Sequence, residues 1–144
     1  MTVVFGQDKL VAAWVAEQLG YGGFDGMFGA IGVVKDGSII GGTVLHNIYP
    51  KEGVVEMTSA CTDSRWLTRR MIRAIFSYAF DLLESQTVVM RVSETNTVMV
   101  NIAERFGFKG YLIPRLRGRN EAEWIFTMSD DQWRSSRFRN SNHG

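Results

Sequence analysis

The sequence predicts a single domain built on a mixed α/β sheet. Its 144 residues are 45% apolar and 22% charged, which suits one globular domain with a sizeable core. Strand-like and helix-like segments follow in the order strand, helix, three strands, helix, strand, helix, two strands. A parallel sheet would show a regular strand–helix alternation, so this order favours a mixed sheet. We expect the domain over residues 1–128, and a short helix with a basic, disordered tail over residues 129–144.

The first 29 residues predict a strand, a helix and a loop. Residues 2–5 are rich in β-branched side chains, and residues 9–19 carry apolar side chains at helical spacing. Gly20 is typical of the residue that ends a helix. The glycine-rich segment 20–29 lacks the lysine of a phosphate-binding P-loop, so we interpret it as a mobile loop with aromatic anchors.

A three-stranded meander is expected next, at residues 28–35, 38–48 and 54–60. The dipeptide Asp36-Gly37 is a favoured two-residue hairpin turn between the first two strands. The pair Gly41-Gly42 lies inside the second strand and indicates a bulge or a close approach of another part of the chain. Short connections place all three strands side by side in one sheet.

The remaining segments predict helices at residues 65–83, 96–106 and 130–135, and strands at residues 87–92, 108–113 and 121–128. Asp63 or Ser64 is suited to cap the long first helix of this set. Its wide apolar stripe predicts that the helix packs against the sheet. Gly107 is typical of a residue that ends a helix.

Composition weighs against several classes of protein. The net charge of +1, from 16 basic and 15 acidic residues, does not favour nucleic-acid binding over the whole surface. The single cysteine excludes an internal disulfide and a zinc site of several cysteines. The apolar runs are shorter than a membrane span and the first residues lack a secretory pattern, so we expect a cytoplasmic protein.

Metal-dependent and covalent catalysis lack their usual residues in this sequence, and we expect no metal site. We interpret His46 as a strand or hairpin surface residue rather than a base or a ligand. We interpret Cys61 as a small, partly buried residue rather than a nucleophile, because no histidine is obviously paired with it.

Arginines are concentrated where the third meander strand leads into the long helix. Four of them fall within nine residues, at Arg65, Arg69, Arg70 and Arg73. The free N–H groups and positive dipole end of a helix start attract anions, whereas arginines placed there oppose the dipole. The junction therefore indicates a phosphate or pyrophosphate ligand; the alternative is that the arginines simply point into water.

A second informative segment runs from Asn96 to Phe108 and reads NTVMVNIAERFGF. It resembles the Asn-x-x-Ala/Ser-x-x-x-Tyr-x-x-x-Gly-Phe signature of the GCN5-related N-acetyltransferases, above all the subgroup that acetylates ribosomal proteins and protein N-termini. The spacing from asparagine to glycine and the closing Gly107-Phe108 both match. The expected order of elements over residues 2–128 is also similar to that family, which implies its single-domain acyl-CoA N-acyltransferase fold.

The resemblance implies acetyl-CoA as cosubstrate. Main-chain groups near Ser59, Ala60 and Cys61 would pair with its pantetheine arm. The turn that holds its pyrophosphate would consist of Arg65, Trp66, Leu67, Thr68, Arg69 and Arg70. Asn96 would either contact the cofactor or cap its own helix. Trp66 would be either a packing anchor or a surface on which the ligand stacks.

Two departures from the family pattern bear on the chemistry. Thr68 and Arg70 stand where the family's pyrophosphate loop has glycines, which crowds the approach of a phosphate. Their side chains, together with Arg69, offer replacement hydrogen-bond donors. The tyrosine that often protonates the leaving thiolate in the family corresponds to Ala103. Tyr111, Cys61 or water would have to replace it.

The family's mechanism implies direct attack of a primary amine on the thioester. The amine would belong to a protein N-terminus, a lysine or a small molecule. Glu56 is the expected base, unless it is a solvent-facing strand residue. Tyr21, Phe24 and Tyr49 would line the acceptor side.

Two alternatives stay open. One is a protein of the same fold that binds CoA or a partner without turnover. The other is a nucleic-acid-associated or base-modifying protein that uses the arginines. No membrane partner is expected, and homodimer formation is left open.

Overall fold

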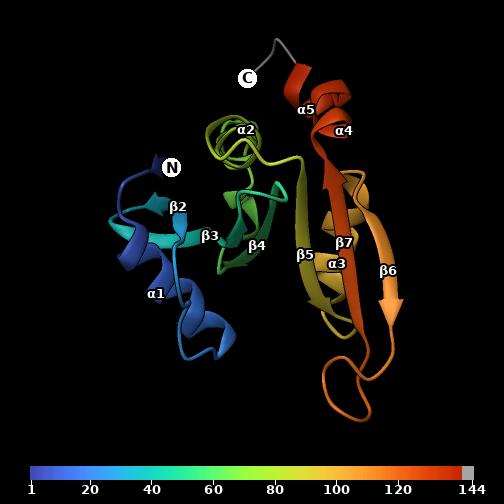
Figure 1. Ribbon diagram of the computed structural model, residues 1–144. Coiled ribbons are helices and arrows are strands. Elements are labelled where there is room, and N and C mark those ends of the chain that lie inside the picture. The colour runs from blue at the N-terminus through green and yellow to red at the C-terminus, as the bar shows by residue number, and fades with distance from the viewer. Residues whose placement is uncertain (141–144) are drawn as a thin grey trace.

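The computed structural model describes residues 1–140, which form one domain around a mixed sheet, as predicted (Figure 1). Within these residues the sheet has seven strands in the order β1-β2-β3-β4-β5-β7-β6. The strands are β1 (Thr2–Val4), β2 (Gly29–Lys35), β3 (Ser38–Tyr49), β4 (Val54–Cys61), β5 (Thr87–Ser93), β6 (Lys109–Ile113) and β7 (Glu123–Ser129). Neighbouring strands are antiparallel except for β4 and β5, which run parallel.

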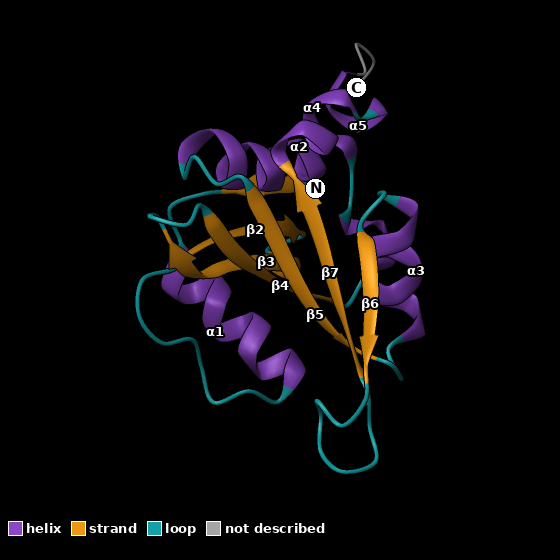
Figure 2. Ribbon diagram, turned by 45° about the vertical axis from the view of Figure 1, so that its right-hand side comes forward, coloured by secondary structure: helices purple, strands orange, loops and turns teal. Residues whose placement is uncertain are grey.

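Helices cover both faces of the sheet (Figure 2). They are α1 (Asp8–Leu19), α2 (Arg69–Ser77), α3 (Thr97–Arg105), α4 (Asp130–Ser135) and α5 (Arg137–Asn140). Val11 and Val15 of α1 pack with Val44 of β3 in a small cluster on one face. The larger cluster lies on the other face, where α2 contributes Met71 and Phe76. None of the helices described within residues 1–140 is both long and apolar enough to cross a membrane.

The parallel contact between β4 and β5 is short. The register joins Val54 to Thr87 and Glu56 to Val89 at its two ends. Beyond Glu56, β4 stays paired with β3, whereas β5 is paired with β7. The two halves of the sheet therefore separate after Glu56, and the β5 side of β4 is left without a strand partner.

The close backbone approach expected at Gly41 is confirmed. A Cβ atom on Gly41 would lie 2.6 Å from the indole of Trp66, and one on Gly42 would lie 2.9 Å from Val11. Trp66 is only 2% exposed and belongs to the larger core cluster. Glycine at position 41 thus allows the Trp66 indole to lie directly on the sheet. The buried indole in turn anchors the segment between β4 and α2.

The long helix predicted at residues 65–83 begins four residues later than expected. Asp63 caps a short 3-10 turn, η1 (Ser64–Trp66), and Thr68 then caps α2 by accepting a hydrogen bond from the Met71 N–H at 3.1 Å. The extended backbone at Thr68 separates the two turns. After Ser77 the chain widens into a π-helical turn, η2 (Tyr78–Leu82).

The expectation of a disordered tail is wrong for the part of it that the structure describes. Helix α4 forms as predicted, and a capping box at Ser129 and Gln132 begins it. Trp133 is 2% exposed and its ring lies 4.7 Å from that of Phe76. Phe138 of α5 meets the ring of Phe106 edge to face at 4.8 Å. Apolar burial therefore holds this segment; residues 141–144 lie outside the described part of the chain.

Candidate functional site

Two adjoining cavities lie where the sheet opens. One, of about 420 Å³, lies under the two loops that follow α1 and β6, and we call it the loop cavity. The other, of about 100 Å³, lies between the diverging parts of β4 and β5, and we call it the strand cavity. They share four lining residues, namely Tyr21, Thr58, Arg91 and Arg117. The cavities therefore form one cleft along the unpaired side of β4.

A histidine and a carboxylate face each other in the loop cavity of this cleft. His46 of β3 is paired across the sheet with Glu56 of β4, and its Nε2 lies 3.6 Å from Glu56 Oε2. The same nitrogen lies 2.7 Å from the hydroxyl of Thr58. Asn47 donates a hydrogen bond from Nδ2 to Glu56 Oε1 at 2.9 Å. Both Glu56 and His46 line the loop cavity.

The expectation that His46 is a surface residue is wrong. Its exposed fraction is 9%, and the ring of Phe24 lies against it at 4.8 Å. Burial lowers the pKa of His46 below its ordinary value, although the nearby Glu56 carboxylate acts in the opposite direction. The imidazole is therefore neutral near pH 7 and able to accept a proton.

A buried ion cluster joins β5, β7 and the loop between β6 and β7. Glu123 is 1% exposed. Arg91 donates to its Oε1 from Nε at 2.7 Å, and Arg117 donates to its Oε2 from Nε at 2.6 Å. Burial lowers the pKa of Arg117, but hydrogen bonds to Tyr21 and Glu123 outweigh that effect and the net pKa is raised. Arg117 thus links its own loop to Tyr21 and to Glu123 through side chains rather than through backbone pairing.

The residues expected along the pantetheine arm lie on β4, where the cleft runs. Ser59 lines the strand cavity and shares a 2.8 Å hydrogen bond with the Thr43 hydroxyl. Ala60 turns its side chain to the opposite face and packs in the α1 cluster. Cys61 is an exposed residue at the end of the strand. The pKa of its thiol is raised, mainly because the sulfur is partly shielded from water and to a lesser extent because of the nearby Asp63 charge. The main chain of this segment is the edge that β5 leaves unpaired.

The residues expected at the pyrophosphate turn divide into two groups. Thr68, Arg69 and Arg70 are exposed at the first turn of α2, where the Thr68 hydroxyl accepts a hydrogen bond from the Met71 N–H. Arg65 is instead bound to Asp63 through two hydrogen bonds, of 3.0 and 2.8 Å. Hydrogen bonds from Arg65 hold the pKa of the Asp63 carboxyl well below its usual range.

Two further members of that turn point into the core. Trp66 lies buried against Gly41, which favours the packing interpretation of this residue. Leu67 is half-buried beside it and borders a small apolar hollow that also contains Met57 and Met99.

Asn96 caps its own helix and also faces the cleft. Its Oδ1 accepts a hydrogen bond from the Met99 N–H at 3.2 Å, which caps α3. It also lines the strand cavity. The cap and a contact to a ligand in that cavity are therefore compatible.

Two predicted site residues lie away from the cleft. Tyr111 is 47% exposed on the edge strand β6, and β7 separates that strand from β5. Tyr49 is 56% exposed at the end of β3 and does not line the loop cavity. Tyr21 and Phe24, in contrast, share the loop cavity with Glu56. Ala103, at the position of the family's tyrosine, is completely buried.

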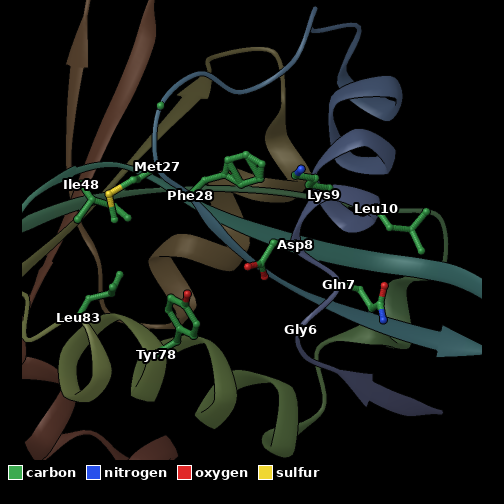
Figure 3. A pocket seen from close by; sticks show the side chains of 11 residues that line it. Gly6, Gln7, Asp8, Lys9, Leu10, Met27, Phe28, Ile48, Tyr78 and Leu83 are labelled. Carbon is green, nitrogen blue, oxygen red and sulfur yellow. The ribbon is translucent and has the colours of Figure 1, made fainter.

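A separate cavity of about 680 Å³ lies between the start of α1 and η2 (Figure 3). Asp8 accepts a hydrogen bond from the Ala30 N–H at 3.0 Å, and burial together with the Asp8 charge raises the pKa of Tyr78. This cavity shares no lining residue with the cleft. Within residues 1–140 no group of three histidine, cysteine or acidic side chains is placed to hold a metal ion.

Comparison with solved structures shows the fold. A probable acetyltransferase is 20% identical over 74% of this chain, with a TM-score of 0.63, and this chain covers 63% of its length. Mutant forms of the spermidine/spermine N-acetyltransferase SpeG from Vibrio cholerae are 18% identical, cover 78% of this chain and 74% of their own, and have a TM-score of 0.65. A chimera of Vibrio cholerae SpeG and hSSAT is 13% identical, covers 93% and 98% of the two chains, and reaches a TM-score of 0.70.

No curated protein matches the sequence. The ribosomal-protein and N-terminal acetyltransferase subgroup is not confirmed, because the structural neighbours named above include spermidine N-acetyltransferases instead. The sequence does match the acetyltransferase (GNAT) domain over residues 7–109, which is most of the chain. With the opened sheet described above, this match shows that the chain belongs to the GNAT family of N-acetyltransferases, whose cosubstrate is acetyl-CoA.

Proposed function

We propose that this protein is an acetyl-CoA-dependent N-acetyltransferase that acts on a small cationic amine. The observation that carries the proposal is the separation of β4 from β5 directly after Glu56, with two adjoining cavities along the separated strands. A thioester lying in the strand cavity would meet an amine lying in the loop cavity. Family membership supports acetyl-CoA as the source of the acetyl group.

The cofactor side has suitable donors. The unpaired edge of β4 near Ser59, Ala60 and Cys61 offers main-chain groups to the amides of the pantetheine arm. At the end of that edge, the first turn of α2 carries the exposed residues Arg69 and Arg70. A helix start with adjacent guanidinium groups suits a pyrophosphate, because dipole and charges act in the same direction.

The charges of the loop cavity support a cationic acceptor. Its formal charges are +2 from Arg91 and Arg117 and −3 from Asp25, Glu56 and Glu123, which sum to −1 with His46 neutral. Glu123 is committed to the two arginines, so Asp25 and Glu56 are the carboxylates that can face a ligand. The aromatic rings of Tyr21 and Phe24 add apolar surface that tolerates an alkyl ammonium group. A volume of about 420 Å³ suits a small amine.

Proton transfer is assigned to the His46–Glu56 pair in the loop cavity. The amine nitrogen forms a bond to the thioester carbon, the carbon–sulfur bond breaks, and the nitrogen loses a proton. Glu56, or the neutral His46 beside it, would take that proton directly or through water. The thiolate also needs a proton. Because Tyr111 lies on the far edge strand, Cys61 and water are the donors that remain from those expected.

One observation favours the alternative of a CoA-binding protein without turnover. Ala103 stands at the position of the proton-donating tyrosine, and it is fully buried. The nucleic-acid alternative is weaker, because several arginines of the clusters are paired with carboxylates. These pairs are Arg65 with Asp63, Arg117 with Glu123 and Arg134 with Asp130.

The test has two stages. A thermal-shift titration with acetyl-CoA should raise the melting temperature, because a ligand that binds only the folded state stabilises it by mass action. Thiol release from acetyl-CoA is then measured with spermidine, a simple alkyl diamine, a lysine-containing peptide and an N-terminal peptide. We expect release with the small amines. Binding without release supports the alternative, and an unchanged melting temperature contradicts the acetyl-CoA assignment.

A further inference from the structure

We propose that Tyr21, Arg117, Glu123 and Arg91 form a clasp across the cleft, and that the clasp positions the acceptor amine beside the thioester without contributing to the turn that would bind the pyrophosphate. The inference rests on the proposed function in one respect, namely that the loop cavity receives the amine. The connection between the two loops does not depend on that function and can be tested separately.

The clasp joins the two parts of the domain that the sheet leaves apart. Tyr21 follows α1, and its N–H donates to Ala16 of that helix at 2.8 Å. Arg117 belongs to the loop between β6 and β7, and its N–H donates to Glu121 in the same loop at 3.1 Å. The sheet connects these parts only through the short β4–β5 pairing. Tyr21 and Arg117 line the same two cavities and their side chains interact, which adds a connection across the open side.

Glu123 makes this connection rigid. The carboxylate is 1% exposed and receives Arg91 through Nε and Nη2, both at 2.7 Å, and Arg117 through Nε at 2.6 Å. A buried carboxylate that lost one of these partners would be left undercompensated, so both guanidinium groups are strongly held. The planar, forked guanidinium of Arg117 can bond to Glu123 and Tyr21 at the same time, which an ammonium on a flexible stem does poorly.

The position of the clasp indicates what it controls. Tyr21, Arg91 and Arg117 line both the loop cavity and the strand cavity, so they stand at the passage between them. An amine in the loop cavity must reach the thioester through this passage. The first turn of α2, where the pyrophosphate is proposed to bind, contributes no residue to either cavity. Loss of the clasp should therefore weaken the use of the amine much more than the affinity for CoA.

The experiment uses Tyr21→Phe, Arg117→Met and the double variant, with Arg119→Met as the matched control from the same loop. Tyr21 is 42% exposed, so removal of its hydroxyl alone does not threaten folding. Arg119 is exposed and lines neither cavity. The readouts are KM for spermidine, KM for acetyl-CoA, the Kd of CoA and amide hydrogen exchange of residues 21–28.

Each single variant should raise KM for spermidine about tenfold, as expected for a lost hydrogen bond to a charged group. The double variant should be no worse than Arg117→Met, because both changes break the same connection. Exchange in residues 21–28 should accelerate in each variant, while the Kd of CoA changes much less than the KM for spermidine. The control should behave as wild type in every readout.

Unchanged hydrogen exchange at residues 21–28 in Tyr21→Phe would overturn the clasp, as would fully additive effects of the two changes or an equal loss of CoA affinity. Failure of the proposed function has a different signature. If the wild-type protein shows no turnover with any amine, the exchange measurement still decides whether the two loops are connected.

Discussion

His46 and Glu56 stand opposite each other on β3 and β4, with Nε2 of the imidazole 3.6 Å from Oε2 of the carboxylate. The pairing places a neutral histidine and a carboxylate in the same cavity, at the point where β4 and β5 part. Two influences act on the imidazole, since burial disfavours its charged form and Glu56 favours it. Burial is the larger effect, so the imidazole stays neutral near pH 7 and is available to accept a proton.

The first prediction separates the two candidate bases by their pH profiles. Glu56→Gln removes the charge that raises the pKa of His46, so that pKa should fall further below its ordinary value. If His46 takes the proton, the acid limb of the kcat/KM profile moves to lower pH in Glu56→Gln and vanishes in His46→Gln. If Glu56 takes it, activity in Glu56→Gln falls at all pH values without such a shift. Glu52→Gln, an exposed change outside the cleft, serves as control.

The second prediction concerns stability in mild acid. Because the folded-state pKa of His46 is lowered from its ordinary 6.5, the unfolded chain binds a proton more readily than the folded one. The contribution of the neutral imidazole is therefore fully present above pH 6.5 and is lost as the pH falls through the folded-state pKa. In His46→Gln the free energy of unfolding should therefore fall less than in the wild type as the pH decreases from 7.5 to about 5, as measured by urea unfolding. A pH dependence identical to that of the wild type would contradict the neutral imidazole.

The sequence was sufficient for most of the architecture because the signals were local. Helical periodicity located α1 and α3, and the Asp36-Gly37 dipeptide located the turn between β2 and β3. Gly41 was expected to mark a close approach, and Trp66 provides it. Each of these features depends on neighbouring residues or on the steric needs of a single glycine.

The His46–Glu56 pair was missed because register is not a local property. Tyr49 is paired with Val54, and counting back from that pair without interruption would place His46 opposite Met57. A bulge between His46 and Tyr49 shifts the register by one residue and brings Glu56 opposite His46 instead. A one-residue shift also changes which face of the sheet a side chain occupies, so the pattern alone could not show this contact.

Long-range ion pairs and the C-terminal segment were missed for a related reason. Arg117 and Glu123 are near each other in sequence, but the burial of Glu123 depends on Arg91 from β5. In the tail, a run of arginines and serines suggested disorder, while Trp133 and Phe138 supply the apolar contacts that order it. Few apolar residues suffice when an existing core offers them a surface.

The third prediction tests the proposed pyrophosphate turn. Arg69→Ala combined with Arg70→Ala should weaken CoA binding by tenfold or more, because charged hydrogen-bond donors are lost at the helix start. The melting temperature without ligand should change little, since arginines there oppose the helix dipole. Arg105→Ala combined with Arg119→Ala removes the same total charge elsewhere and should leave the affinity unchanged. Arg65→Met should have a smaller effect than the double variant, because Asp63 already binds its guanidinium.

Equal affinity for CoA in the Arg69/Arg70 variant and the wild type, measured by calorimetry, would remove these residues from the binding site. Equal losses in both double variants would show instead that only the overall charge matters, and raising the ionic strength would then abolish the difference from the wild type.

The fourth prediction concerns the anchor of the same turn. In Gly41→Ala the new Cβ would lie 2.6 Å from the Trp66 indole, which cannot move away within a close-packed core without disturbing its neighbours. We expect a loss of about 1–3 kcal/mol in the free energy of unfolding, the usual range for overpacking. Gly22→Ala is the matched control, since its Cβ would meet no atom within 4 Å. That change should stay within about 0.5 kcal/mol of the wild type.

Because Trp66 precedes α2 directly, its displacement in Gly41→Ala should also reorient the first turn of that helix and weaken CoA binding. Urea unfolding gives the stability, the tryptophan emission spectrum reports the indole environment, and calorimetry gives the affinity. A Gly41→Ala protein as stable as Gly22→Ala would mean that the core accommodates the methyl group, and the turn would then not depend on this contact. A destabilised protein with full CoA affinity would instead separate the packing of Trp66 from the geometry of the binding turn.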